Sequence, residues 1–193
     1  MQDNDIRILL LPYLKKENKK YKNTIIVEEL DLCSGLSRID IAVINGVIHG
    51  YEIKSEKDTL NRLPNQINYY NKSLERISVV TNRSHLKQIR KLVPQWWGLL
   101  VIKNDGKKNI VSELRKAKNN PLLDCLSLLH VLWKEELISI VDNYELKVSR
   151  HLNKRKIRES VINELDKSIL SQEVRLALKS RQNWRSCSTT NVI

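Results

Sequence analysis

This sequence lacks both paired cysteines and long apolar segments. Its three cysteines, Cys33, Cys125 and Cys187, lie far apart, and no Cys-x-x-Cys pair or suitably placed histidine completes a zinc site. No apolar run approaches the roughly 20 residues that a membrane-spanning helix needs. We therefore expect no structural zinc, no membrane association and a reducing, cytoplasmic setting.

The chain is short and strongly basic. Its 193 residues suffice for one ordinary domain with a small helical annex. Lysine and arginine outnumber aspartate and glutamate by 34 to 22, which gives a net charge of +12. Such a charge favours a polyanionic partner, and nucleic acid is the obvious candidate, because cationic side chains neutralise phosphates and release their counterions. Many cytosolic proteins are equally basic, so charge alone does not decide.

A β-hairpin is the strongest local structural signal. Residues 37–44 and 47–54 are rich in β-branched side chains, and Asn45-Gly46 between them is typical of a turn. Because side chains alternate along a strand, Glu52 and Lys54 point to one face of the second segment. An acid and a base therefore share a surface.

The register of this hairpin decides whether its acids meet. A plain two-residue turn would pair Asp40 with Tyr51 and leave Glu52 on the other face. A one-residue offset, from a three-residue loop or a bulge near a glycine, would place Asp40 opposite Glu52. We predict this offset because it brings the two carboxylates together.

Two carboxylates and a lysine suit phosphodiester hydrolysis. Asp40 and Glu52 on neighbouring strands would form a hard-oxygen site for Mg²⁺ or Mn²⁺, which polarises a phosphate and lowers the pKa of bound water. The Lys54 ammonium can orient that water or stabilise developing charge. An aspartate followed by Glu-x-Lys is nevertheless common in proteins, so this spacing alone is weak evidence.

The same pattern resembles the one that names the PD-(D/E)XK nuclease superfamily. Asp40 is followed, one hairpin later, by Glu52 and Lys54, although Ile39 replaces the proline before the aspartate. The resemblance implies a restriction-endonuclease-like α/β fold, with a mixed central sheet of about four or five strands flanked by helices. It also implies a metal-dependent nuclease that acts on nucleic acid, with DNA as the expected substrate.

A second motif extends the resemblance. Gln66-x-x-x-Tyr70 is similar to the Gln-x-x-x-Tyr motif of the RecB-like branch, which lies on the helix after the Glu-x-Lys strand. Residues four apart share one helical face, so both side chains can reach the metal site or the DNA backbone. Over residues 5–98 the chain also resembles a family of bacterial and phage proteins placed in this superfamily.

The resemblance implies a role for each residue of the site. Asp40, Glu52 and the carbonyl oxygen of Ile53 would bind Mg²⁺ or Mn²⁺, and Lys54 would position the attacking water. The residues expected to contact the substrate are Gln66, Tyr70 and Arg38.

Another acid often completes sites of this superfamily. Glu29 is the first choice here, because it ends the first expected strand before Asp40. Glu28 and Asp5 are its rivals. Only one of Glu28 and Glu29 can face the site if their segment is extended.

The rest of the chain predicts alternating helices and strands, followed by helices alone. Helices are expected at residues 4–14, 60–74 and 84–92, and strands at 24–27, 77–81 and 98–103. From about Lys107 only helices are expected, one starting at Pro121 and a last one over residues 160–179. We therefore expect a nuclease-like core over residues 1–106 and a helical C-terminal region over residues 107–193.

Several alternatives stay open. Trp96-Trp97 suits base stacking or, more often, a core position. The basic segment of residues 150–158 suits a phosphate backbone or a solvated helix. The main alternative function is a catalytically weak, nuclease-fold subunit that binds nucleic acid or regulates a partner. RNA as the substrate, and a homodimer or larger complex, also remain open.

Overall fold

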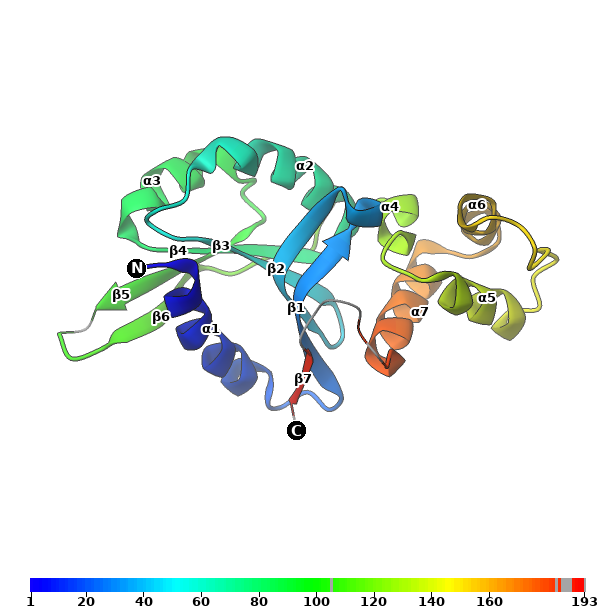
Figure 1. Ribbon diagram of the computed structural model, residues 1–193, viewed down its shortest axis with the longest axis horizontal. Coiled ribbons are helices and arrows are strands. Elements are labelled where there is room, and N and C mark those ends of the chain that lie inside the picture. Colours follow the sequence, from blue (N-terminus) through cyan, green and yellow to red (C-terminus); the bar gives the residue numbers. More distant parts are fainter. Residues whose placement is uncertain (105, 183, 185–188, 193) are drawn as a thin grey trace.

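The computed structural model is built around one mixed β-sheet and describes residues 1–104, 106–182, 184 and 189–192 (Figure 1). Its strands are β1 (Thr24–Leu32), β2 (Ser37–Ile44), β3 (Ile48–Lys54), β4 (Arg76–Thr81), β5 (Gly98–Asn104), β6 (Asn109–Arg115) and β7 (Thr189–Val192). Their order across the sheet is β6-β5-β4-β3-β2-β1-β7. The pairs β3–β4 and β4–β5 are parallel, and the other pairs are antiparallel.

Helices cover both faces of the sheet. On one face α1 (Asp3–Asn18) buries Ile6, Leu10 and Leu14, which recur at helical spacing, against apolar side chains of the strands. On the other face lie α2 (Leu63–Ser73) and α3 (Arg83–Leu92) (Figure 1). The expected mixed α/β architecture is thus confirmed.

Four further helices stand beside the β1–β2 end of the sheet (Figure 1). They are α4 (Cys125–Leu129), α5 (Lys134–Asn143), α6 (Lys154–Glu164) and α7 (Lys167–Ser180). Their apolar side chains join the same buried cluster as α2 and α3. Among the described residues, no helix is both long enough and apolar enough to span a membrane.

The predicted hairpin and its register are confirmed. In the β2–β3 pair, Ile41 lies opposite Tyr51 and Ile44 lies opposite Ile48, so that residues 45–47 form a three-residue connection. Continuing this register by one residue sets Asp40 opposite Glu52. The offset therefore brings both acids to the same side of the sheet.

The expectation of helices only after Lys107 is wrong for β6, which pairs with β5 as an antiparallel edge strand. No residue of β6 is fully buried, so it lacks the alternating apolar pattern by which a strand is recognised. With β7 as well, the sheet has seven strands in place of the four or five expected. The sheet therefore extends past residue 106.

The predicted helix boundaries also need correction. The helix expected at Pro121 begins only at Cys125, where the Asp124 side chain accepts a hydrogen bond from the Ser127 backbone N–H and so caps the helix. The last expected helix is two helices, α6 and α7. The first helix continues to Asn18, into a lysine-rich stretch expected to be a loop.

Two smaller expectations have clear outcomes. Trp97 is fully buried and donates a hydrogen bond to Asn71, and Trp96 packs against the same core, so both tryptophans are structural. Cys33 and Cys125 are free thiols, while Cys187 lies outside the described residues.

Close packing under β4 and β5 predicts that Gly98→Ala destabilises the fold. A Cβ atom at Gly98 would overlap Ser78 Oγ and would lie 3.1 Å from the Ala117 backbone nitrogen. We expect a loss of about 1–3 kcal/mol in the free energy of unfolding, measured by urea denaturation. Gly46→Ala is the matched control, because no atom lies within 4 Å of its added Cβ. Equal stability of the two variants would contradict this account of the packing.

Candidate active site

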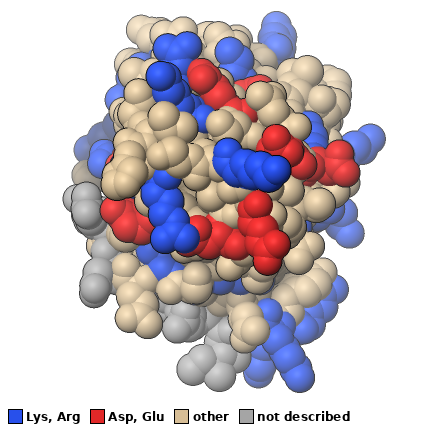
Figure 2. Space-filling view, turned by 90° about the vertical axis from the view of Figure 1, so that its right-hand side faces the viewer, with Lys and Arg blue, Asp and Glu red and all other residues tan. Residues whose placement is uncertain are grey.

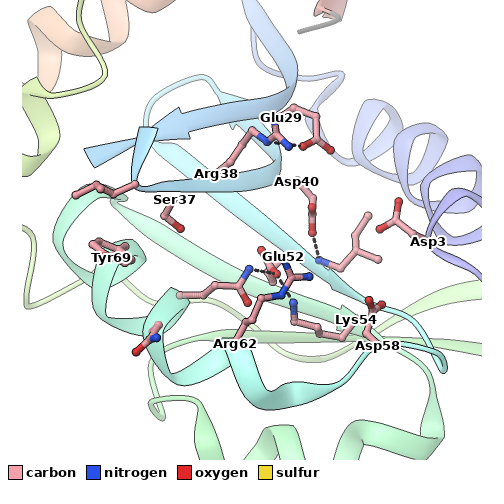
Figure 3. Close-up of a pocket in the computed structure, with 14 residues that line it drawn as sticks. Asp3, Glu29, Ser37, Arg38, Asp40, Glu52, Lys54, Asp58, Arg62 and Tyr69 are labelled. Carbon is pink, nitrogen blue, oxygen red and sulfur yellow. Dashed lines mark hydrogen bonds and ion pairs between the residues drawn. The ribbon is translucent and has the colours of Figure 1, made fainter. Parts of the chain in front are cut away.

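An open cleft of about 620 Å³ lies where β2, β3 and α2 meet (Figure 3). Seven of the eight candidate site residues line it, namely Glu29, Arg38, Asp40, Glu52, Ile53, Lys54 and Gln66. The eighth, Tyr70, is buried beneath the cleft. The hairpin and the helix that follows it therefore bring the two sequence motifs to one place.

Glu52 is the most enclosed acid of the cleft, with 2% of its surface exposed. Its Oε1 accepts hydrogen bonds from Lys54 Nζ at 2.5 Å and from Gln66 Nε2 at 2.7 Å. Its Oε2 accepts one from the Tyr70 hydroxyl at 2.6 Å. Gln66 and Tyr70 share a helical face, as their spacing predicts, and that face holds Glu52 in place.

Asp40 lies across the cleft from this group (Figure 3). Its Oδ2 accepts a hydrogen bond from the Ile53 backbone N–H at 2.6 Å, and its Oδ1 lies 3.3 Å from the Arg7 guanidinium. Burial and the negative charge of Glu52 raise the pKa of Asp40 to about 8, although the Ile53 N–H and Arg7 act to lower it. Asp40 therefore holds its proton up to about pH 8, and the two acids repel each other once both are ionised.

Arg7 of α1 is a central residue of the site that the sequence did not reveal. Its guanidinium bonds to Asp3 at 2.6 Å and to Glu29 at 2.5 Å, and it also reaches Glu28 and the Asp40 carbonyl oxygen. Burial acts to lower the pKa of Arg7, but these acidic neighbours outweigh it and the net shift is upward. The only trace in the sequence is the i, i+4 spacing of Asp3 and Arg7, which predicts a local ion pair and no contact with the strands.

Glu29 enters the cleft because β1 is interrupted there. Its φ is +57°, a left-handed conformation that costs a residue with a side chain roughly 1–2 kcal/mol. The β1–β2 pairing continues on either side, with Glu28 opposite Ile41 and Leu30 opposite Ile39, but it omits Glu29 and Asp40. The interruption lets Glu28 and Glu29 both reach Arg7, which a regular strand would not allow.

The rivals for the third acid lie outside the cleft walls. Glu28 contacts Arg7 without lining the cleft. Asp5 accepts a hydrogen bond from the Gln2 backbone N–H and caps α1. Glu29 thus has the best placement of the three, and it also forms an ion pair of 2.9 Å with Arg38 at the cleft rim.

Seven further residues line the cleft, and of these Asp58 and Arg62 flank the Glu-x-Lys motif, where the sequence suggests substrate contact, support of the acids or simple structural pairing. The seven are Asp3, Leu36, Ser37, Asp58, Arg62, Asn65 and Tyr69. Arg62 and Arg38 are exposed, so they supply positive charge at the opening. His49 bonds to Ser78 and Tyr51 and does not line the cleft.

The donor groups of the cleft fit a hard divalent cation. Asp40 and Glu52 supply carboxylate oxygens, no lining residue is a histidine or cysteine, and Mg²⁺ is commonly held by one or two carboxylates together with water. The raised pKa of Asp40 marks a repulsion that a cation would relieve. Gln66 Oε1 is buried without a hydrogen-bond partner among the described residues, so a cation-bound water would satisfy it.

The cleft is nevertheless not a closed metal cage. Within the described part of the chain, no three histidine, cysteine, aspartate or glutamate side chains are grouped as a metal site. Both carboxylate oxygens of Glu52 already accept hydrogen bonds. A cation could therefore reach Glu52 at Oε2, which accepts only the Tyr70 hydroxyl, whereas Oε1 is already shared by Lys54 and Gln66.

Comparison with known proteins defines the family. The family described as Bacteriophage P4 protein cII matches residues 1–191. The chain belongs to the bacteriophage P4 protein cII family. Protein cII of Enterobacteria phage P4 is 24% identical over 186 residues, which cover 96% of this chain and 70% of that protein. The cII match thus includes the candidate active site and the C-terminal helices together.

One solved structure is similar in part. It is SPO1766, a protein of unknown function from Silicibacter pomeroyi, with 13% identity and a TM-score of 0.38. The similarity covers 66% of this cII family member and 86% of that chain.

The repulsion between the two acids predicts a pH-dependent effect of Asp40→Asn. The pKa of Asp40 is about 8 in the folded state and about 4 in an unfolded chain, so the folded state holds the extra proton between these values. Stability is then lost as the pH rises through this window. Asp40→Asn removes the charge and should raise the free energy of unfolding at pH 8 by at least about 1 kcal/mol, with little effect at pH 5.

Chemical denaturation at several pH values measures this difference. Glu17→Gln, which removes an exposed acid near the far end of α1, is the control. A difference between Asp40→Asn and wild type that stays constant from pH 5 to pH 8.5 would show that the two acids do not repel as described.

Proposed function

We propose that this cII family member is a metal-dependent nuclease of the PD-(D/E)XK type that hydrolyses phosphodiester bonds in DNA. One observation carries the proposal. The Asp–Glu-x-Lys pattern and the Gln-x-x-x-Tyr pattern, separate in the sequence, meet at a single carboxylate: Lys54, Gln66 and Tyr70 all donate hydrogen bonds to Glu52. Three hydrogen-bond donors on one buried acid, beside a second acid, are not expected in a cluster of surface residues that has no function.

Each residue of the cleft has a part in this proposal. Asp40, Glu52 and the Ile53 carbonyl oxygen would hold Mg²⁺ or Mn²⁺, which when bound polarises a phosphate oxygen and lowers the pKa of a water. The Lys54 ammonium group, beside Glu52 in the cleft, would orient the attacking water and offset negative charge at the phosphate.

The remaining residues hold these groups and the substrate. Gln66 and Tyr70 keep the Glu52 carboxylate directed into the cleft. Arg38, with 56% of its side chain exposed at the rim, is placed to contact a DNA phosphate. Arg7 and Glu29 fix the Asp40 side of the cleft and are positioning residues.

A second candidate function is a catalytically weak subunit that binds nucleic acid or regulates a partner. The observation in its favour is that each acid already has a cationic neighbour, since Lys54 pairs with Glu52 and Arg7 reaches Asp40. A protein that binds nucleic acid or a partner without cleaving it needs no metal ion beside Asp40 and Glu52.

Cleavage assays separate the two functions. The wild type is incubated with linear and circular, single- and double-stranded DNA in Mg²⁺, Mn²⁺ or EDTA. Asp40→Asn and Lys54→Met should each lower the cleavage rate by at least about 100-fold, because each removes a group needed in the transition state. Glu17→Gln and Lys16→Met are the controls, since they make the same changes at exposed positions of α1. DNA that is bound but never cut by the wild type would favour the second function.

Metal binding has a test that needs no activity. In the proposed site Mg²⁺ binds the folded state, so it should raise the melting temperature of the wild type. At ten times the dissociation constant the gain is about 1.4 kcal/mol. Asp40→Asn should lose most of this gain, whereas Glu17→Gln should keep it. Equal stabilisation of all three proteins would mean that Mg²⁺ does not bind at Asp40.

A further inference from the structure

A second cleft, of about 340 Å³, adjoins the candidate active site, and Glu29 lines both. One side of this cleft is formed by the end of β1 and the short helix that follows it. The other side is formed by the C-terminal helices. Its walls are formed by Glu29, Leu30, Asp31, Ser34, Gly35, His130, Val131, Leu132, Trp133, Lys154, Arg181 and Trp184. The function proposed above uses only Glu29 of these residues.

Basic groups gather at this second cleft. His130 and Lys154 line it, and the Arg158 guanidinium lies within electrostatic reach of both. Burial and the charge of Arg158 lower the pKa of His130 and of Lys154, although Asp124 opposes the shift at His130, and Glu135 and Glu136 oppose it at Lys154. The positive charges of Lys154 and Arg158 therefore repel each other, and the lowered pKa of His130 favours its neutral form.

Two buried nitrogens of this basic group are unsatisfied. Arg158 is only 4% exposed and donates from Nε to the Leu129 carbonyl oxygen, but its Nη2 has no hydrogen-bond partner among the described residues. His130 Nδ1 is likewise buried without a described partner. Unpaired buried polar atoms cost about 1–3 kcal/mol each, and of these two residues only His130 lines the cleft, so an acceptor such as a phosphate oxygen that reached its ring would be bound favourably.

Two aromatic side chains also line the second cleft, apart from its basic groups. The Arg181 guanidinium lies 4.4 Å from the Trp133 ring centroid and 4.6 Å from that of Trp184. Glu136 neutralises Arg181 with two hydrogen bonds of 2.6 Å. Arg181 thus lies against one face of each tryptophan ring and holds both rings in place, so that a base could stack only on a ring face that Arg181 leaves open.

We propose that this second cleft binds a single strand of nucleic acid, with a phosphate at Lys154 and His130, within the field of the buried Arg158, and a base beside Trp133 and Trp184. The strand continues past Glu29 into the candidate active site, so this inference rests on the proposed nuclease function for its biological meaning. A volume of about 340 Å³ admits a nucleotide and excludes a duplex, whose bases are stacked inside a wide rod.

The charge distribution on the outer face of the molecule favours binding within the cleft over binding across a broad surface. Figure 2 shows that face at the C-terminal helices, where acidic side chains lie among the lysines and arginines. No uninterrupted basic surface is visible there among the described residues. A strand held by charge alone would have poor support on this face.

Binding in EDTA tests the proposal without any cleavage. The probe is a fluorescently labelled single-stranded oligonucleotide of about 15 nucleotides, followed by anisotropy. Lys154→Ala should weaken binding at least about fivefold, since it removes a phosphate contact beside buried cationic groups. Lys156→Ala, two residues along the same helix and outside the cleft, removes the same charge and should change binding less than twofold.

A second variant tests the aromatic wall. Trp184→Ala should weaken binding by about 5- to 100-fold if a base stacks there. Circular dichroism checks that the Trp184→Ala variant remains folded. If this variant does not fold, Lys154→Ala still tests the proposal, because Lys154 is exposed. Equal effects of Lys154→Ala and Lys156→Ala would overturn the proposal, as would equal competition by duplex DNA or displacement by a mononucleotide at the same concentration.

The same assay separates this proposal from the nuclease proposal. It is repeated with Glu17→Gln, which alters an exposed acid of α1 outside both clefts and should bind the oligonucleotide as the wild type does. Binding that depends on Lys154, without any metal-dependent cleavage, would support the proposed role of the second cleft and reject the proposed nuclease function. Cleavage without such binding would retain the nuclease and reject the second cleft.

Discussion

The enclosure of Glu52 beside Asp40 is the constraint on which the rest of the site depends. Two carboxylates in a poorly hydrated cleft repel each other, and an unpaired buried charge costs several kcal/mol. The fold offsets this cost with donors from several parts of the chain. Lys54 comes from the same strand, Gln66 and Tyr70 come from α2, and the Ile53 N–H and Arg7 serve Asp40.

This requirement accounts for features that are otherwise costly. The three-residue hairpin connection sets the two acids opposite each other. α1 contributes Arg7, whose partly buried guanidinium is held by acids from three segments of the chain. Glu29 adopts a left-handed conformation that a regular strand would avoid, and this conformation is what brings its carboxylate to Arg7. Strain of this kind is typical of functional sites, where the surrounding structure holds it in place.

Sequence reasoning succeeded where the interactions are local or periodic. The hairpin, its offset and the shared face of Gln66 and Tyr70 follow from the strand period of 2 and the helix period of 3.6. It could not find Arg7, because nothing near this residue in the chain indicates contact with strands more than 20 residues away. It missed β6 because an edge strand without buried side chains has no alternating pattern, although Asp105-Gly106 before it is a common turn pair.

The charges of the two clefts differ, and this difference suggests why the acidic first cleft lies next to the more basic second cleft, with Glu29 lining both. A cleft that gathers Asp3, Glu29, Asp40, Glu52 and Asp58 repels a polyanion, so it supplies little binding energy for nucleic acid by itself. Binding energy from remote contacts can instead hold a substrate at an unfavourable reacting centre. In the two proposals above, the basic and aromatic groups at the C-terminal helices would do this, because Glu29 lines both clefts and so joins them. The proposals thus give the C-terminal helices a part in substrate binding that the acidic cleft could not supply by itself.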